Sequence, residues 1–259
     1  MFTYYKGSDG EWYCEALENA FDTEAQYKYT NGKQVAEKSA NSYKWFKVEP
    51  IKWRVLTDNY SRNKLIFCES GIYAGVCYYD QYKVNRDIGG STIYPNNYEH
   101  SRIRAWLNGL EFQLGDATNS DHNGKGFLQT AFTAEEQAAI AMTTVDNSAK
   151  STGSTSNDYA CEDTSDKVFL LSYTEAANSE YGFTNEDVRI RIRKPTDFAL
   201  ANYGYLSSTD GCGGWCVLRS PNCRDSCNAS YVISDGDLSY YLNVGNKSPL
   251  VVPALSLAP

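Results

Sequence analysis

The stretch from Tyr203 to Pro259 limits the possible folds most strongly, because two kinds of segment alternate within it. Some segments have the length and residue types of short strands and tight turns, whereas those between them are mostly polar. This alternation predicts short strands that form a fixed framework, joined by exposed loops. The framework comprises Trp215, Leu218–Pro221, Ala229–Val232, Asp235–Leu238 and Val251–Leu255.

The segments between the framework use an unusual set of residue types. Most of these types have codons that differ from an Asn codon only at its two adenines, as for Cys, Tyr, Ser, Asp, Arg, Gly, Leu and Pro. Adenine-directed mutagenesis of the 3′ end of a gene would leave such a pattern. The sequence therefore predicts a variable surface within about 212–250 that comprises Cys216, Asn222, Cys223, Arg224, Asp225, Cys227, Asn228, Tyr240, Tyr241, Asn243, Asn246, Ser248, Pro249 and Leu250.

Composition excludes several classes of partner. With 259 residues the chain can bury an ample core, and its 14% aromatic residues favour a β-rich or irregular architecture. A formal net charge of −8 argues against a nucleic acid or an anionic membrane as the partner. No apolar run approaches the roughly 18 residues of a membrane-spanning helix.

The pattern of residues predicts an α+β fold with small antiparallel sheets, a few helices and long loops. We expect a hairpin tip at 30–33, two strands between Lys44 and Leu56 broken at Pro50, and a strand over Leu65–Phe67. Helices are predicted over 99–108, from Thr133 to about Met142, after Ser172, and over 195–204. The expected core comprises Trp53, Ile103, Trp106, Leu107, Phe169, Leu171, Leu218 and Val252.

Four of the eight cysteines, at 212, 216, 223 and 227, form two C-x3-C units. A zinc site, disulfides and independent surface positions all remain open for them. We favour independent positions, because three of the four lie among the variable residues and zinc knuckles usually have C-x2-C spacing. No metal and no cofactor is therefore predicted.

The order of several motifs resembles a known family. These motifs are Trp53-Arg54-Val55-Leu56, Ser101-x-Ile103-Arg104-x-Trp106-Leu107-Asn108, Ala131-Phe132-Thr133-x-Glu135, Asp166-x-Val168-Phe169-Leu170-Leu171-Ser172, Trp215-x-x-Leu218-Arg219-Ser220-Pro221 and Val251-Val252-Pro253-Ala254-Leu255. Together they resemble the variable proteins of diversity-generating retroelements, which have a C-type-lectin fold related to formylglycine-generating enzymes.

The resemblance implies a binding protein rather than an enzyme. In such systems a reverse transcriptase copies a template with errors at adenines, and the lectin-type fold carries the variation on exposed side chains. The resemblance further implies one lectin-type domain over 45–259, preceded by an N-terminal strand-and-turn extension over 1–44. The ligand would be a protein or a glycan. The chain would be a monomer on the bacterial cell surface or outside the cell, attached to a membrane only through a lipid anchor.

Two alternatives to a diversified binder remain open. One is a cysteine-dependent oxidase of the formylglycine-generating type, which would use Cys212 and Cys216 or Cys223 and Cys227. The other is a calcium-independent, lectin-like carbohydrate-binding protein, since Tyr94–Asn97 only faintly resembles a calcium-dependent sugar-binding loop. Against an enzyme, the sequence has two histidines, neither at metal-ligand spacing, and it has none of the common nucleophile or phosphate-loop motifs.

Some residues near the variable surface are expected to be structural. Trp215 is predicted to lie in the core, and Arg219 to be buried and paired. Arg219, Ser220 and Asp235 are expected to hold the backbone beneath the variable side chains. For Tyr240 and Tyr241, strand alternation allows one buried and one exposed ring, and we expect at least one ring on the binding face.

Overall fold

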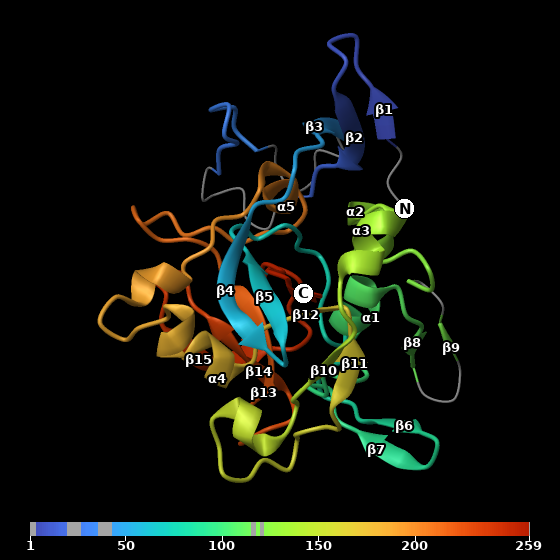
Figure 1. The fold of residues 1–259 in the computed structure, drawn as a ribbon, viewed down its shortest axis with the longest axis vertical. Helices are drawn as coiled ribbons and strands as arrows, with labels where there is room; N and C mark the ends of the chain where they lie inside the picture. Colours follow the sequence, from blue (N-terminus) through green and yellow to red (C-terminus); the bar gives the residue numbers. More distant parts are fainter. Residues whose placement is uncertain (1–3, 20–26, 36–42, 115–117, 120–121, 259) are drawn as a thin grey trace.

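The computed structural model describes residues 4–19, 27–35, 43–114, 118–119 and 122–258. Its strands form small, separate sheets in which every pair of adjacent strands is antiparallel, with short helices between them. The chain therefore has the α+β architecture with antiparallel sheets that the sequence predicts (Figure 1).

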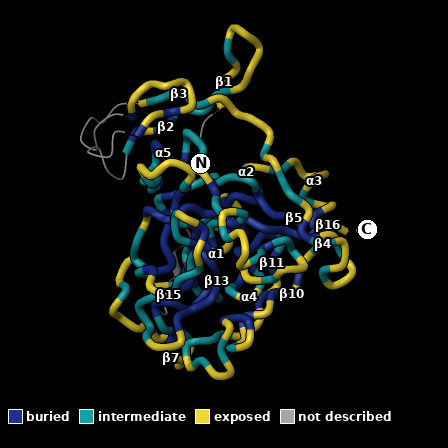
Figure 2. The backbone as a smooth tube through the Cα atoms, turned by 90° about the vertical axis from the view of Figure 1, so that its left-hand side faces the viewer, coloured by how far each residue is buried: buried dark blue, intermediate teal, exposed yellow. Residues whose placement is uncertain are grey.

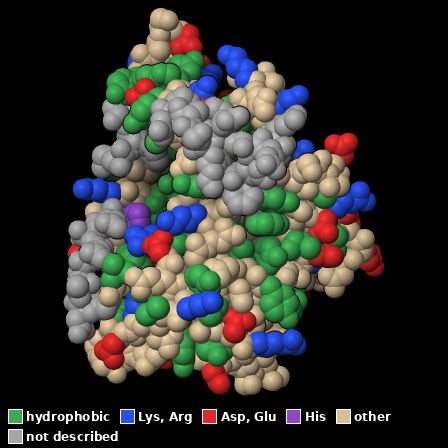
Figure 3. Space-filling view, turned by 180° about the vertical axis from the view of Figure 1, so that it is seen from behind, with side chains coloured by type: hydrophobic (Ala, Val, Ile, Leu, Met, Phe, Trp, Pro, Cys, Tyr) green, Lys and Arg blue, Asp and Glu red, His purple; other side chains and the backbone are tan. Residues whose placement is uncertain are grey.

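The N-terminal sheet lies at one end of the molecule, at the top of Figure 1. It contains β1 (Tyr4–Lys6), β2 (Trp12–Leu17) and β3 (Tyr43–Lys47), in that order. The pairing of β3 with β2 runs past residue 44, the predicted end of the N-terminal extension, as far as Lys47. We call the part of the chain up to the end of β3 the N-terminal unit. Hydrophobic side chains gather at this end of the molecule beside atoms that are not described (Figure 3).

The N-terminal unit packs on the rest of the chain through the predicted hairpin. The backbone N–H of Tyr29 donates to the Lys33 carbonyl, and that of Val35 donates to the Tyr27 carbonyl, which confirms the tip at 30–33. The Thr30 hydroxyl then donates to the Asp197 carboxylate at 2.7 Å. This contact connects the hairpin to the start of α5 (Asp197–Ala201).

The central sheet has the strand order β12-β16-β5-β4. The last strand of the chain, β16, therefore lies between two earlier strands, and it is almost entirely buried. In Figure 2 the buried backbone runs through the middle of the molecule around β5, β13 and β16. The four strands are β4 (Trp53–Tyr60), β5 (Asn63–Cys68), β12 (Val168–Phe169) and β16 (Ala254–Leu257).

A second three-stranded sheet, in the order β13-β14-β15, contains most of the predicted variable region. Three two-stranded sheets complete the β structure of the described residues. The second three-stranded sheet comprises β13 (Cys216–Pro221), β14 (Asn228–Val232) and β15 (Leu238–Asn243). The two-stranded sheets are β6 (Arg86–Ile88) with β7 (Ser91–Ile93), β8 (Phe112–Gln113) with β9 (Thr118–Asn119), and β10 (Thr143–Val145) with β11 (Thr164–Asp166).

The helices after Thr133 and Ser172 begin where their capping residues predict, whereas the helix predicted over 99–108 begins at Arg102 and the one predicted over 195–204 covers Asp197–Ala201. Thr133 and Ser172 both form capping boxes, and Gly109 ends α1 in the left-handed region with φ of 68°. The third helix ends at Ala139 rather than near Met142, because the buried Ile140 leaves the helix to pair with Leu257. The α-helices are α1 (Arg102–Asn108), α2 (Phe127–Ala131), α3 (Ala134–Ala139), α4 (Tyr173–Ala176) and α5 (Asp197–Ala201), and the 3-10 helices are η1 (Ala149–Thr152), η2 (Ser179–Tyr181) and η3 (Val188–Arg191).

The core contains six of the eight residues predicted for it: Ile103, Leu107, Phe169, Leu171, Leu218 and Val252. Trp53 and Trp106 are half-buried and pack against the outside of the core. The Trp53 ring lies near Phe132, and the Trp106 ring stacks on Tyr73 and Phe127. Trp215 is also half-buried, with its ring stacked on Tyr205 at 3.9 Å between centroids. None of the described helices is long and apolar enough to cross a membrane.

Candidate functional site

The structure does not bring all of the predicted variable residues to one exposed face. Cys223, Arg224, Tyr240 and Tyr241 are exposed, and Asp225, Cys227, Asn228, Asn243 and Asn246 are half-buried. The prediction of exposure is wrong for Cys216, Asn222, Ser248, Pro249 and Leu250, which are all buried.

Leu250 and Cys216 are buried because backbone pairing places both in the core. The two residues form a parallel bridge, and the Leu250 N–H donates to the Trp215 carbonyl at 2.6 Å. The Leu250 side chain is 0% exposed and fits between Gly71 and Gly214. A Cβ on either glycine would lie 2.5 Å from Leu250 Cδ1, so this packing requires both glycines.

The segment before Leu250 is held by its own backbone and by a neighbouring loop. The Ser248 carbonyl accepts a hydrogen bond from the Tyr205 N–H at 3.0 Å, and the Ser248 N–H donates to Asn246 Oδ1 at 2.9 Å. This hydrogen-bonded turn leaves Pro249 buried. The sequence alone does not predict this burial, because Tyr205, which donates to Ser248, is more than forty residues away along the chain.

Asn222 is 1% exposed because its side chain holds the 221–224 turn against β15. Its Nδ2 donates to the Tyr240 carbonyl and to Asp225 Oδ2, both at 3.0 Å. Its Oδ1 accepts from the Arg224 N–H at 2.9 Å. Asn222 is thus a structural residue, and it presents no free group to a ligand.

Asn96 is a residue that sequence reasoning missed as a support of this region. It is 0% exposed, and its Nδ2 donates to the carbonyls of Asp225 at 2.9 Å and Asn228 at 3.0 Å. A buried amide with two backbone acceptors fixes the whole 225–228 loop. No sequence signal points to this role, because the contact spans more than 120 residues.

The expected supports are confirmed only in part. Arg219 is 1% exposed and paired, as predicted, and Ser220 is also buried. The hydrogen bonds of both side chains go to segments that neighbour the 222–228 loop, and not to that loop. Asp235 is exposed and caps its own turn by accepting from the Asp237 N–H, so its predicted role is wrong.

A β-bulge exposes both tyrosines of β15. The register between β14 and β15 shifts between Ala229 and Tyr231, so that Ser230 lies opposite two residues, Tyr240 and Tyr241. A bulge interrupts strand alternation and changes the direction of the side chains. The exposed fractions are 37% for Tyr240 and 61% for Tyr241, so neither ring is buried.

These tyrosines line a cavity of about 280 Å³. The cavity lies between the turn after β13, the middle of β15 and the loop after η1. That third segment lies outside the predicted variable region, and its part in the site was not foreseen. The lining residues are Thr152, Gly153, Ser154, Pro221, Asn222, Cys223, Arg224, Tyr240 and Tyr241.

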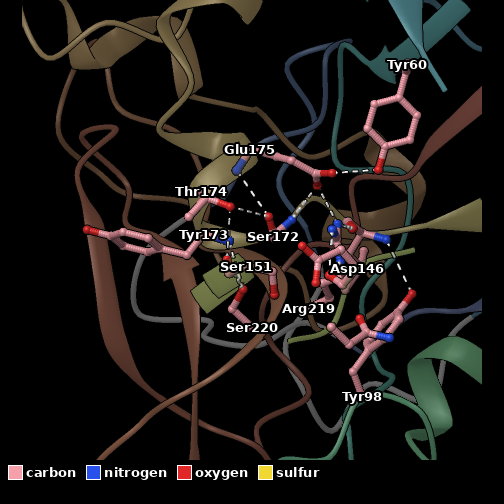
Figure 4. A network of polar contacts seen from close by, with 12 residues as sticks. Tyr60, Tyr98, Asp146, Ser151, Ser172, Tyr173, Thr174, Glu175, Arg219 and Ser220 are labelled. Carbon is pink, nitrogen blue, oxygen red and sulfur yellow. Dashed lines mark hydrogen bonds and ion pairs between the residues drawn. The ribbon is translucent and has the colours of Figure 1, made fainter. Parts of the chain in front are cut away.

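Ser220 joins two of the elements around the cavity. Its hydroxyl accepts from the Tyr173 N–H at 2.9 Å and donates to the Ser151 carbonyl at 3.2 Å (Figure 4). Thr174 adds a second bond to the same Ser151 carbonyl, at 3.2 Å. The helix η1 and the start of α4 are thus bonded to β13.

Arg219, the residue before Ser220, forms a buried ion pair with Glu175 (Figure 4). The Arg219 guanidinium also donates to the backbone carbonyls of Asp146 and Leu170, and Tyr60 donates to the Glu175 carboxylate at 2.7 Å. Burial alone would raise the pKa of Glu175, but Arg219 and the hydrogen bonds outweigh it and hold that pKa below its usual value. The carboxylate is therefore charged at neutral pH.

Tyr240 is fixed by an aromatic contact with α4. Its ring stacks on Tyr173 with centroids 4.8 Å apart, and Tyr173 in turn contacts Gly153 across the cavity wall. Partial burial and the hydrogen bond with Tyr173 raise the pKa of Tyr240 to about 12. The phenol is therefore neutral at physiological pH and acts as a hydrogen-bonding group.

None of the eight cysteines forms a disulfide. Burial raises the pKa of Cys216 to about 12 and that of Cys68 to about 11, so both are protonated at neutral pH. Among the described residues, no group of three or more His, Cys, Asp or Glu side chains is arranged to hold a metal ion. The exposed thiol in the cavity is that of Cys223.

The fold and the site together define an α+β protein with a cavity beside a bulged strand. The chain belongs to the family described as Domain of unknown function (DUF6273), whose model matches residues 55–259. This match includes every residue that lines the cavity and excludes β1, β2 and β3. A search of curated proteins and a search of solved structures each found no match.

Proposed function

We propose that the protein is a ligand-binding protein whose site is the cavity between η1, the turn after β13 and β15. The observation that carries the proposal is that two adjacent tyrosines line this cavity from a bulged strand. Both are exposed, and Tyr240 is held in place by Tyr173. Rigid aromatic side chains provide a large contact area with little loss of conformational entropy, as in antibody paratopes.

The proposal includes a fold of the C-type-lectin type, in its formylglycine-generating-enzyme form, with a surface diversified by a retroelement. Support comes from the motif order and from the exposure of several residues with Asn-derived codons. We restrict the proposed diversified set to the exposed side chains of the predicted variable region, which are Cys223, Arg224, Tyr240 and Tyr241.

Binding is proposed rather than catalysis. A cysteine-dependent oxidase needs an ionisable, accessible thiol, and Cys216 is 3% exposed with a raised pKa. This observation weakens the assignment of Cys212 and Cys216 as a reactive pair. The net charge of −8 continues to favour a protein or glycan partner over a nucleic acid. We further propose that the chain is a monomer displayed at the cell surface or outside the cell, with a lipid anchor as its only attachment to a membrane.

Two display libraries test the proposal. The first randomises Cys223, Arg224, Tyr240 and Tyr241, and the second randomises Cys216, Asn222, Ser248 and Leu250. Most members of the first library should stay folded, as judged by resistance to protease, and selection should yield binders to unrelated targets. Most members of the second should be degraded. Loss of folding in the first library, or failure to select any binder from it, would contradict the proposed function.

A further inference from the structure

The charges around the cavity are asymmetric. Its lining includes one guanidinium, from Arg224, and no carboxylate or ammonium group. The neighbouring Asp225 forms no ion pair with Arg224, and its carboxylate accepts hydrogen bonds within the loop. Its Oδ1 accepts from the Cys227 N–H at 2.9 Å and from Asn228 Nδ2 at 3.0 Å, while its Oδ2 accepts from Asn222.

Arg224 is therefore available to an anionic group. Among the described residues it forms no ion pair, and its Nη1 lies 3.4 Å from the Tyr241 hydroxyl. A guanidinium binds a planar carboxylate through two parallel hydrogen bonds. In a protein of net charge −8, an uncompensated arginine in a cavity indicates a local preference for an acidic ligand.

The remaining lining side chains match a sugar better than a peptide. No Leu, Ile, Val, Met or Phe lines the cavity, so it lacks the aliphatic pocket that anchors apolar peptide side chains. It offers instead two phenol rings and the hydroxyl oxygen of Ser154, which can accept a hydrogen bond while its proton is donated to the Ser156 carbonyl. The Thr152 hydroxyl is already bonded to Ala149 and Asn157. The C–H groups on one face of a pyranose carry partial positive charge and pack against the negative face of an aromatic ring, while its hydroxyls need hydrogen-bond partners.

The size of the cavity limits the ligand to a small group. Its volume of about 280 Å³ is just below the range of roughly 300 to 1,000 Å³ usual for small-molecule sites. A terminal sugar residue fits this scale. We propose that the cavity binds the end of a saccharide through a carboxylate-bearing residue, a uronic or a sialic acid. The carboxylate lies on Arg224 and the ring lies against Tyr241. This inference rests on the proposed function and specifies its ligand.

The test is calorimetric titration of the intact chain with matched pairs of saccharides. The pairs are sialyllactose with lactose, and a disaccharide ending in glucuronic acid with its glucose counterpart. One acidic member should bind at least about tenfold more tightly than its neutral partner, as expected for a hydrogen bond to a charged group. The pair that shows the preference identifies the source of the carboxylate.

Three variants separate the contributions. Arg224→Gln should weaken binding of the acidic sugar about tenfold to a hundredfold and leave neutral sugars unchanged. Tyr241→Ala should weaken both classes. Arg189→Gln is the matched control, because that arginine side chain is 78% exposed on η3, away from the cavity lining, and should change nothing.

Three results would overturn the inference: equal binding of acidic and neutral sugars, no effect of Arg224→Gln, or no binding of any sugar in the panel. Each would leave the proposed function in place if the library at the exposed positions still yields binders. Failure of that library would instead count against the site itself.

Discussion

Tyr240 lies face to face with Tyr173, with ring centroids 4.8 Å apart and ring planes at 26°. This pair joins the bulged strand β15 to the start of α4. The backbone of Tyr173 is in turn bonded to Ser220 of β13, next to the buried Arg219. One side of the cavity is thus connected to the buried ion pair of Arg219 and Glu175 through these contacts, and the predictions below follow from this connection.

Gly153→Ala should destabilise the protein and deform the cavity wall. Gly153 has φ of 77°, which costs a residue with a Cβ about 1–2 kcal/mol, and the new Cβ would lie 2.8 Å from the Tyr173 ring. Overpacking adds about 1–3 kcal/mol. Gly211→Ala is the control, with φ of 81° and nothing within 4 Å. Urea unfolding should show a larger loss at 153 than at 211, and equal losses would refute the packing role of Tyr173.

Arg219→Met should cost about 3–5 kcal/mol of unfolding free energy, because it leaves the Glu175 carboxylate buried without its partner. Arg54→Met is the matched control. The Arg54 pair with Glu69 is 37% and 33% exposed, and such pairs contribute about 0–1 kcal/mol. Denaturant titration of both variants measures the difference. Similar losses in the two variants would mean that the Arg219 pair is not the support of this region.

Glu175 should make stability fall in acid. Its folded pKa is lower than its unfolded value, so its contribution is fully present above the unfolded value near 4.5. That contribution is lost as the pH falls through the folded pKa. Glu175→Gln removes the titration, so the variant should lose less stability between neutral pH and acid than the parent does. Parallel curves of unfolding free energy against pH would contradict this assignment.

Leu250→Ala and Tyr241→Ala should differ strongly, although the sequence places both residues in one variable set. Leu250 is 0% exposed between two glycines, and its truncation should cost about 2–5 kcal/mol. Tyr241 is 61% exposed, so its truncation should change stability by no more than about 0.5 kcal/mol. Thermal unfolding followed by circular dichroism provides the comparison. A large loss in Tyr241→Ala would show that the ring is structural.

Local signals in the sequence predicted the elements well. Capping residues such as Thr133, Ser172 and Thr196 act through neighbours three residues away, so their role is visible in a short window. The apolar spacing of Ile103 and Leu107 likewise shows the buried face of α1.

The site was harder to predict because its supports act over long distances along the chain. Asn96 bonds a loop more than 120 residues away, and Asn222 is a polar residue that is buried only because β15 supplies an acceptor. Leucine is one of the residue types whose codons can derive from an Asn codon, and Leu250 was therefore predicted to be variable. It is buried instead, and its packing depends on Gly71 and Gly214. Residue type alone does not distinguish a variable surface position from a turn that tertiary contacts have fixed.

The most direct test of the central claim is the sequence of this gene's 3′ end in sister isolates. The account predicts differences confined to adenine-derived codon positions. Those differences should concentrate at Cys223, Arg224, Tyr240 and Tyr241 and spare the buried Asn222 and Leu250. A template repeat and a reverse-transcriptase gene should lie nearby. Differences spread evenly along the gene, or concentrated at the buried positions, would contradict a diversified binding surface.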